Sequence, residues 1–155
     1  MKYACMKYFA FCFIAFVFFS CSTPPPPPKD TAFFEFVGTK TNDNNGGPHI
    51  TELYAIKGKR NIPAMIQFCA SRQKKFSQGD YLYMVFFDAK ENATFANRAD
   101  AWWAYGLDEK AMRHMLAYYE STGTNGILDY YENNGWESVA QQIQVDVPNE
   151  RQGNF

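Results

Sequence analysis

The sequence contains only two histidines, His49 and His114, and this scarcity excludes the commonest metal and acid–base arrangements. Neither has a second ligand at metal-binding spacing, and no Cys-x-x-Cys pair is present. A zinc site that combined them with Cys69 would require three unrelated segments to converge. We therefore predict no metal site and interpret both histidines as surface residues, His49 in a polar loop and His114 on the flank of a helix.

The sequence motifs of common enzymes are also missing. There is no Gly-x-Ser-x-Gly elbow, no phosphate-binding glycine loop and no dinucleotide fingerprint. No cofactor is therefore expected, and no catalytic residue is assigned. One catalytic alternative stays open: a small hydrolase in which Asp88 works with Glu91 or Asp100, because paired carboxylates can hydrolyse glycosidic bonds.

The chain lacks an excess of positive charge. Its formal net charge is −1, and without Lys2 and Lys7 it holds 13 basic and 16 acidic residues. Nucleic-acid-binding domains are normally basic, so composition argues against nucleic acid as a partner. One basic group, Lys57, Lys59 and Arg60, is predicted to be a solvated turn or, alternatively, to meet an acidic partner or phospholipid headgroups.

No apolar run is long enough to span a membrane. The longest, Tyr8 to Phe19, falls short of the roughly 20 residues that a spanning helix needs. Lys2 and Lys7 precede this run, and the small residue Ser20 follows it directly. A basic front, a short apolar middle and a small residue at the end are typical of a secretory signal peptide. Residues 1–20 are therefore predicted to be removed.

The segment Val17-Phe18-Phe19-Ser20-Cys21 resembles the cleavage site of bacterial lipoproteins, whose signal is cut just before a cysteine that carries lipid. The resemblance covers residues 1–21 only. It implies lipid on Cys21 and attachment to a bacterial membrane without a spanning segment. It also implies residence in the cell envelope; the outer membrane is favoured, and the periplasmic or surface side is left open. The alternative is ordinary secretion with cleavage nearby, which leaves Cys21 as a free thiol.

The other cysteines agree with this assignment. Cys5 and Cys12 lie in the signal segment, so lipid on Cys21 leaves Cys69 without a disulfide partner. A lone cysteine in an oxidising compartment is expected to be buried and inert. Pro24 to Pro28 follow Cys21 and predict a stiff polyproline II spacer of roughly 15 Å.

A tether at residues 21–29 is predicted to lead into one domain, residues 30–148, followed by a loose tail, residues 149–155. Helices are predicted from Asn61 to Phe76 and from Asp108 onward, the second with a Met112–Tyr119 stripe. Strands are predicted at 32–37, 50–57, 81–87, 127–132 and 136–147, with 101–105 as a further candidate. This order predicts an α+β fold: a two-layer sandwich whose largely antiparallel sheet of four to six strands carries two helices on one face.

Three local patterns make sharper predictions. Gly38 to Pro48 is predicted to be a long polar loop, and Asn134-Gly135 a tight hairpin turn. In the first helix Met65 and Cys69 are expected to face the core, whereas Arg72 and Gln73 are expected to lie mostly outside.

Aromatic residues are the strongest sign of function in the domain. Trp103 and Tyr105 would share one face of the candidate strand at 101–105, and Trp136 would start the last strand. Exposed Trp and Tyr on a sheet are typical anchors for protein partners. The leading prediction is a non-catalytic envelope lipoprotein that binds a protein. Carbohydrate or peptidoglycan binding through the same three residues is the alternative, because aromatic rings stack on sugars.

Overall fold

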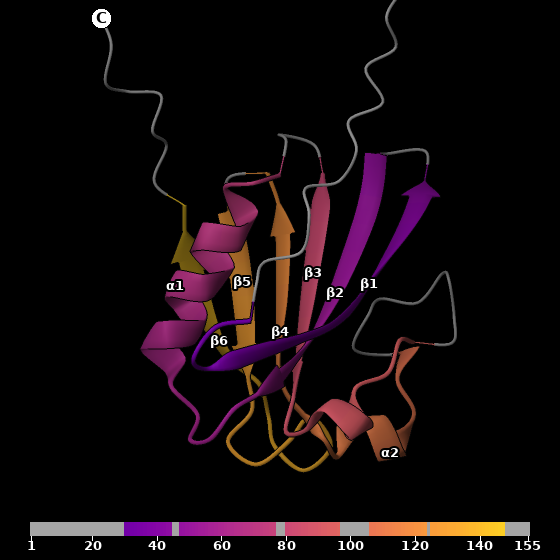
Figure 1. Cartoon of the computed structure of the whole chain (residues 1–155), viewed down its shortest axis with the longest axis vertical. Coiled ribbons are helices and arrows are strands. Elements are labelled where there is room, and N and C mark those ends of the chain that lie inside the picture. The colour runs from indigo at the N-terminus through magenta and orange to yellow at the C-terminus, as the bar shows by residue number, and fades with distance from the viewer. Residues whose placement is uncertain (1–29, 45–46, 77–79, 97–105, 124, 148–155) are drawn as a thin grey trace, which may run out of the picture.

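The computed structural model describes residues 30–44, 47–76, 80–96, 106–123 and 125–147 (Figure 1). These residues form one six-stranded sheet with two α-helices and a short 3-10 turn. The strands are β1 (Phe34–Asn44), β2 (Gly47–Ile56), β3 (Tyr81–Phe87), β4 (Met115–Thr122), β5 (Asn125–Tyr130) and β6 (Gln141–Asp146). The helices are α1 (Ile62–Gln73), the 3-10 turn η1 (Lys90–Asn92) and α2 (Glu109–Met112).

The strands lie side by side in chain order, β1 to β6. The pair β2 and β3 is parallel, because α1 carries the chain back across the sheet between them, and every other neighbouring pair is antiparallel. The α+β class with a largely antiparallel sheet is therefore confirmed.

Helix α1 begins as its sequence predicts. The side chain of Asn61 caps it by accepting a hydrogen bond from the backbone N–H of Ala64 at 3.0 Å, and Pro63 occupies the first turn. Met65 and Cys69 are buried, as expected. They join Phe68 in the core between α1 and one face of the sheet, which includes Leu82, Met84 and Phe86 of β3.

The opposite face of the sheet carries a second apolar cluster. Val85 and Phe87 of β3 alternate with the residues of the first cluster, so they point to this other side. Ala111 of α2 packs here. Helix α2 lies near the lower end of the sheet in Figure 1. The sequence predicted both helices on one face, whereas α1 and α2 contribute to clusters on opposite faces.

The predicted second helix is mostly a strand. Asp108 does cap a helix, accepting from the backbone N–H of Ala111 at 2.8 Å, but α2 ends at Met112 and β4 begins at Met115. The first five residues of β4 are all buried, since the strand is covered on both faces. Continuous apolar runs of this kind fit helical spacing as well as a central strand, which explains the error.

The predicted loop at Gly38 to Pro48 is largely a strand pair. Strand β1 continues to Asn44 and β2 begins at Gly47, with partners from Gly38↔Leu53 to Asn44↔Gly47. Because β1 is an edge strand, its outer half tolerates polar residues that resemble a loop.

The Asn134-Gly135 turn does not join two strands directly. Strands β5 and β6 do pair, but residues 131–140 separate them. Within this connection Asn134 Oδ1 accepts hydrogen bonds from the backbone N–H groups of Trp136 at 3.0 Å and Glu137 at 2.9 Å. Asn134 thus closes a local turn inside a longer loop.

Candidate functional site

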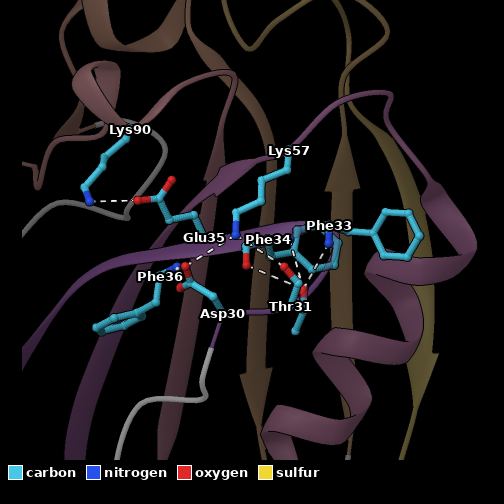
Figure 2. Close-up of polar contacts among 8 residues, drawn as sticks. All are labelled: Asp30, Thr31, Phe33, Phe34, Glu35, Phe36, Lys57 and Lys90. Atoms are coloured by element: carbon cyan, nitrogen blue, oxygen red, sulfur yellow. Dashed lines mark hydrogen bonds and ion pairs between the residues drawn. The ribbon is translucent and has the colours of Figure 1, made fainter.

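The chain enters the domain through a polar clamp at Asp30, the predicted domain boundary (Figure 2). Asp30 Oδ1 accepts from the backbone N–H of Phe36 at 3.0 Å, and Oδ2 lies 3.3 Å from Lys57 Nζ. The hydrogen bond from Phe36 lowers the pKa of Asp30 below its ordinary value. Beside it, Thr31 Oγ1 accepts from the backbone N–H of Phe34 at 2.9 Å. The clamp binds residues 30–31 to β1 and to Lys57, which directly follows β2.

The basic group before α1 makes contacts within the molecule. Lys57 joins the clamp, and Arg60 Nη1 and Nη2 donate to the carbonyls of Tyr131 at 3.0 Å and Asn133 at 2.9 Å. Arg60 therefore ties the start of α1 to the connection between β5 and β6. All three basic residues are exposed, as the predicted solvated turn requires, and two of them also make contacts within the molecule.

The α1 side of the sheet contains a buried ion pair. Arg72 is 2 % exposed and Glu52 is 1 % exposed. Arg72 Nε donates to the two carboxylate oxygens of Glu52 at 3.0 and 2.8 Å, and the hydroxyl of Tyr54 donates to Glu52 Oε2 at 2.6 Å. The guanidinium also lies over the ring of Phe76, 4.8 Å from its centroid. The prediction that Arg72 lies outside was wrong because Glu52, twenty residues earlier, draws it into the core.

A second polar group is enclosed on the same side. The hydroxyl of Tyr119 donates to Gln73 Oε1, and Gln73 Nε2 donates to the carbonyl of Gly123. Gln73 is therefore buried, also against expectation. In the described part of the chain, every buried side-chain nitrogen or oxygen has a hydrogen-bond partner. The buried polar side chains described on the α1 side are thus satisfied within the molecule.

The other side of the sheet differs at the end away from α2. One row across the strands runs Lys40, Thr51, Tyr83, Glu120, Ile127 and Gln144, and the next begins Asn42, His49 and Tyr81. Directly paired residues share a face, so these side chains line one surface. We call His49, Tyr81, Tyr83, Glu120, Ile127 and Asp129 the open face. Its most exposed apolar member is Ile127, at 44 %.

Aromatic rings on the open face are held in pairs. His49 stacks on Tyr81 with centroids 4.4 Å apart, and Tyr83 lies parallel to the more deeply buried Tyr118 at 6.3 Å. The Tyr83 hydroxyl and His49 Nδ1 are 3.4 Å apart. Because all four residues belong to strands, the rings form a preorganised surface. The sequence prediction of a polar loop around His49 is corrected, since it lies in β2.

Two carboxylates, Glu120 and Asp129, adjoin these rings. Burial raises the pKa of Glu120, the Tyr118 hydroxyl that donates to it at 3.4 Å lowers it, and nearby Asp129 raises it again. Partial burial, Glu120 and Tyr81 together raise the pKa of Tyr83 to about 12. Asp129 accepts a hydrogen bond from Gln142 Nε2 at 3.0 Å. The open face therefore combines rings with negative charge in partly dehydrated surroundings.

Of the binding residues predicted from the sequence, the structure describes only Trp136. Its ring is 48 % exposed, and the guanidinium of Arg113 lies 5.8 Å from its centroid. Arg113 is also paired with Glu109 at 2.8 Å and Glu137 at 2.5 Å. Trp103, Tyr105 and Cys21 lie outside the described residues. Trp136 therefore stands apart from the open face, in the connection between β5 and β6.

The predicted catalytic carboxylates are only partly described. Asp88 Oδ2 lies 2.9 Å from His114 Nδ1, and Asp88 Oδ1 accepts from Asn92 Nδ2 at 2.8 Å. Glu91 is exposed, and Asp100 lies outside the described residues. A hydrolase built on Asp88 stays a prediction.

Cys69 is free and completely buried, as expected, and burial raises the pKa of its thiol well above the ordinary value. Within the described ranges, no three His, Cys, Asp or Glu side chains are grouped so as to hold a metal ion. None of the helices in these ranges has the length and the apolar character needed to cross a membrane.

No protein-family model matches this chain, and no curated protein and no solved structure matches it. Sequence reasoning missed the open face, although one signal was present: in β5, exposed Asn125 and Ile127 and half-buried Asp129 alternate with Gly126 and Leu128, which are buried. That alternation marks a strand with one solvent-facing side.

Proposed function

We propose that this chain is a membrane-anchored lipoprotein of the bacterial cell envelope. Its non-catalytic domain binds a protein partner through the open face. The sequence at residues 1–21 supports the anchor, since lipid on Cys21 replaces a spanning helix. The clamp supports Asp30 as the start of the domain, because this residue binds both Phe36 of β1 and Lys57, which follows β2.

The observation that carries the binding proposal is the composition of the open face. It places Tyr81, Tyr83 and the exposed Ile127 on one regular sheet surface. Tyrosine is enriched where proteins meet, because its ring supplies a large contact area at little cost in conformational entropy. The partner is therefore expected to cover these strands.

The binding proposal can be tested by placing a photo-crosslinking amino acid at position 127 of the full chain, expressed in the parent cell. We expect an adduct with a protein. The matched control carries the same group at Gln67, which is exposed on α1, on the other side of the sheet. If crosslinking at position 127 is absent, or no stronger than at position 67, the proposal is overturned.

The anchor is tested separately with Cys21→Ser. The variant is expected to lose incorporation of radiolabelled palmitate and to leave the membrane fraction. If the wild-type chain takes up no label, the lipid anchor is overturned and ordinary secretion is the remaining prediction.

Carbohydrate or peptidoglycan is the second candidate partner. The observation in its favour is that the stacked rings of His49 and Tyr81 lie on the same face as the hydrogen-bonded pair Asp129 and Gln142. Rings that stack and amides that hydrogen-bond are what a sugar requires. Retention of the wild-type chain on insoluble peptidoglycan, lost in Tyr81→Ala, would favour this candidate.

A further inference from the structure

We propose that the protein partner presents a cationic side chain, arginine or lysine, to the part of the open face formed by Tyr83, Glu120 and Asp129. This inference rests on the proposed function and adds the chemistry that the partner must have. The expected partner is a basic protein surface, and the test below distinguishes it from a sugar ligand.

The three residues are brought together by strand register. Tyr83 of β3 pairs with Glu120 of β4, which pairs with Ile127 of β5. Asp129 lies one step further along the same side of β5. Neighbouring strands are about 4.8 Å apart, so a tyrosine ring and two carboxylates lie within reach of one incoming side chain.

The charges on this face have one dominant sign. Glu120 and Asp129 are joined by Asp146 of β6, which shares their side of the sheet. Among the described strand residues on this side the lysine is Lys40, which belongs to the edge strand β1, three strands away from β4. Lys90, which follows β3, is paired with Glu35 of β1. Asp129 contributes to raising the pKa of Glu120, so a cation placed between them relieves repulsion.

The molecule already holds two arginines in sites of this composition. Arg113 lies over the ring of Trp136 and pairs with Glu109 and Glu137. Arg72 lies over the ring of Phe76 and pairs with Glu52, whose carboxylate also accepts from Tyr54.

The open face has the same parts, and the described residues supply no lysine or arginine to its carboxylates. Glu120 accepts from the Tyr118 hydroxyl and Asp129 accepts from Gln142. Across the described ranges, neither carboxylate forms an ion pair with a Lys or Arg of this chain. A ring combined with carboxylates recognises a cation through cation–π attraction and charge-assisted hydrogen bonds. The partner is therefore inferred to bring the missing side chain.

The test uses the full chain in detergent micelles and a defined pair of peptides. One is acetyl-Gly-Arg-Gly-Arg-Gly-amide, and the other replaces each arginine by citrulline, which has a similar shape and no charge. Binding is followed by NMR through the backbone amides of Tyr83, Glu120 and Ile127. We expect the arginine peptide to shift these amides and to bind at least about tenfold more tightly than the citrulline peptide.

Two double variants separate a specific site from general attraction to an acidic protein. Glu120→Gln with Asp129→Asn is expected to weaken arginine-peptide binding by about tenfold or more. Glu91→Gln with Glu132→Gln removes the same charge from exposed positions outside the open face, and is expected to change binding by less than about twofold. Equal losses in the two variants would overturn the inference.

The crosslinking experiment at position 127 tells the two proposals apart. A protein adduct that persists in the Glu120/Asp129 double variant would leave the proposed function standing and overturn the cationic partner. Loss of the adduct in that variant, but not in the Glu91/Glu132 variant, supports both proposals. An open face that shifts with soluble peptidoglycan fragments and with neither peptide would overturn both.

Discussion

The two faces of the sheet use the same kinds of residue in opposite ways. On the α1 side, Glu52 is buried in an ion pair with Arg72 and accepts a hydrogen bond from the Tyr54 hydroxyl. On the open face, Glu120 accepts a hydrogen bond from the Tyr118 hydroxyl but forms no ion pair with a Lys or Arg in the described part of the chain. Both faces therefore pair tyrosines with carboxylates, and among the described residues a counter-charge is supplied on the α1 side but not to Glu120.

This difference indicates which face can bind a charged partner. A buried carboxylate without a counter-charge is strongly destabilising, so the enclosed face supplies its own arginine. A carboxylate at a partly solvated surface survives without one and can accept a cation from outside. The largest effects of mutation are therefore expected on the α1 side and the smallest on the open face.

Removing the guanidinium of Arg72 is expected to cause the largest loss of stability. Arg72→Met leaves Glu52 buried without its counter-charge, and the free energy of unfolding is expected to fall by about 3–5 kcal/mol. Urea unfolding followed by circular dichroism measures this change. Adding Glu52→Leu should restore much of the loss, because both charges are then gone; a single variant that loses under about 1 kcal/mol would contradict the buried pair.

Removing one tyrosine hydroxyl from each face should change stability by smaller and unequal amounts. Tyr119→Phe leaves the buried Gln73 acceptor without its donor, and we expect unfolding free energy to fall by about 1–2 kcal/mol. Tyr81→Phe, the matched change on the open face, should alter it by less than about 0.5 kcal/mol. Thermal or urea unfolding of both variants decides this, and equal losses would remove the distinction between the faces.

Trp136→Ala tests whether the exposed ring belongs to the same surface as the open face. It removes the ring beneath Arg113 in the connection between β5 and β6, and the melting temperature is expected to change by about 2 °C or less. Binding of the arginine peptide should stay unchanged. If the variant loses that binding, the functional surface is centred on Trp136.

Glu120→Gln should give the smallest effect, and with the opposite sign. Burial raises the pKa of Glu120 in the folded state, so the folded chain keeps this proton to higher pH than the unfolded chain. Unfolding free energy therefore falls as pH rises from the ordinary glutamate pKa through the raised value. Above that window the glutamine variant should be more stable by about 0.5 kcal/mol or less. Urea unfolding across pH checks this, with Glu132→Gln as the exposed control.

Much of the fold could be predicted because its signals are local. Strand β3 reads as a central strand from its unbroken apolar run, and Asn61 and Asp108 cap helices as their side chains suggest. The strand Met115–Thr122 could not be distinguished from a helix, since burial on both faces removes the alternation that identifies a strand. Trp136, the one predicted binding residue that the structure describes, is exposed but lies in the connection before β6 instead of starting that strand. The open face went unnoticed.

The sequence by itself determined the signal-like start at residues 1–21, the α+β class, the helix caps and the burial of Cys69. These depend on composition and on neighbours a few residues apart. Only the tertiary structure decided that Arg72 turns inward to Glu52, and that Tyr83, Glu120 and Asp129 share one surface. The physical reason is strand register: pairing between distant segments sets which side chains meet, and local sequence carries no record of the partner.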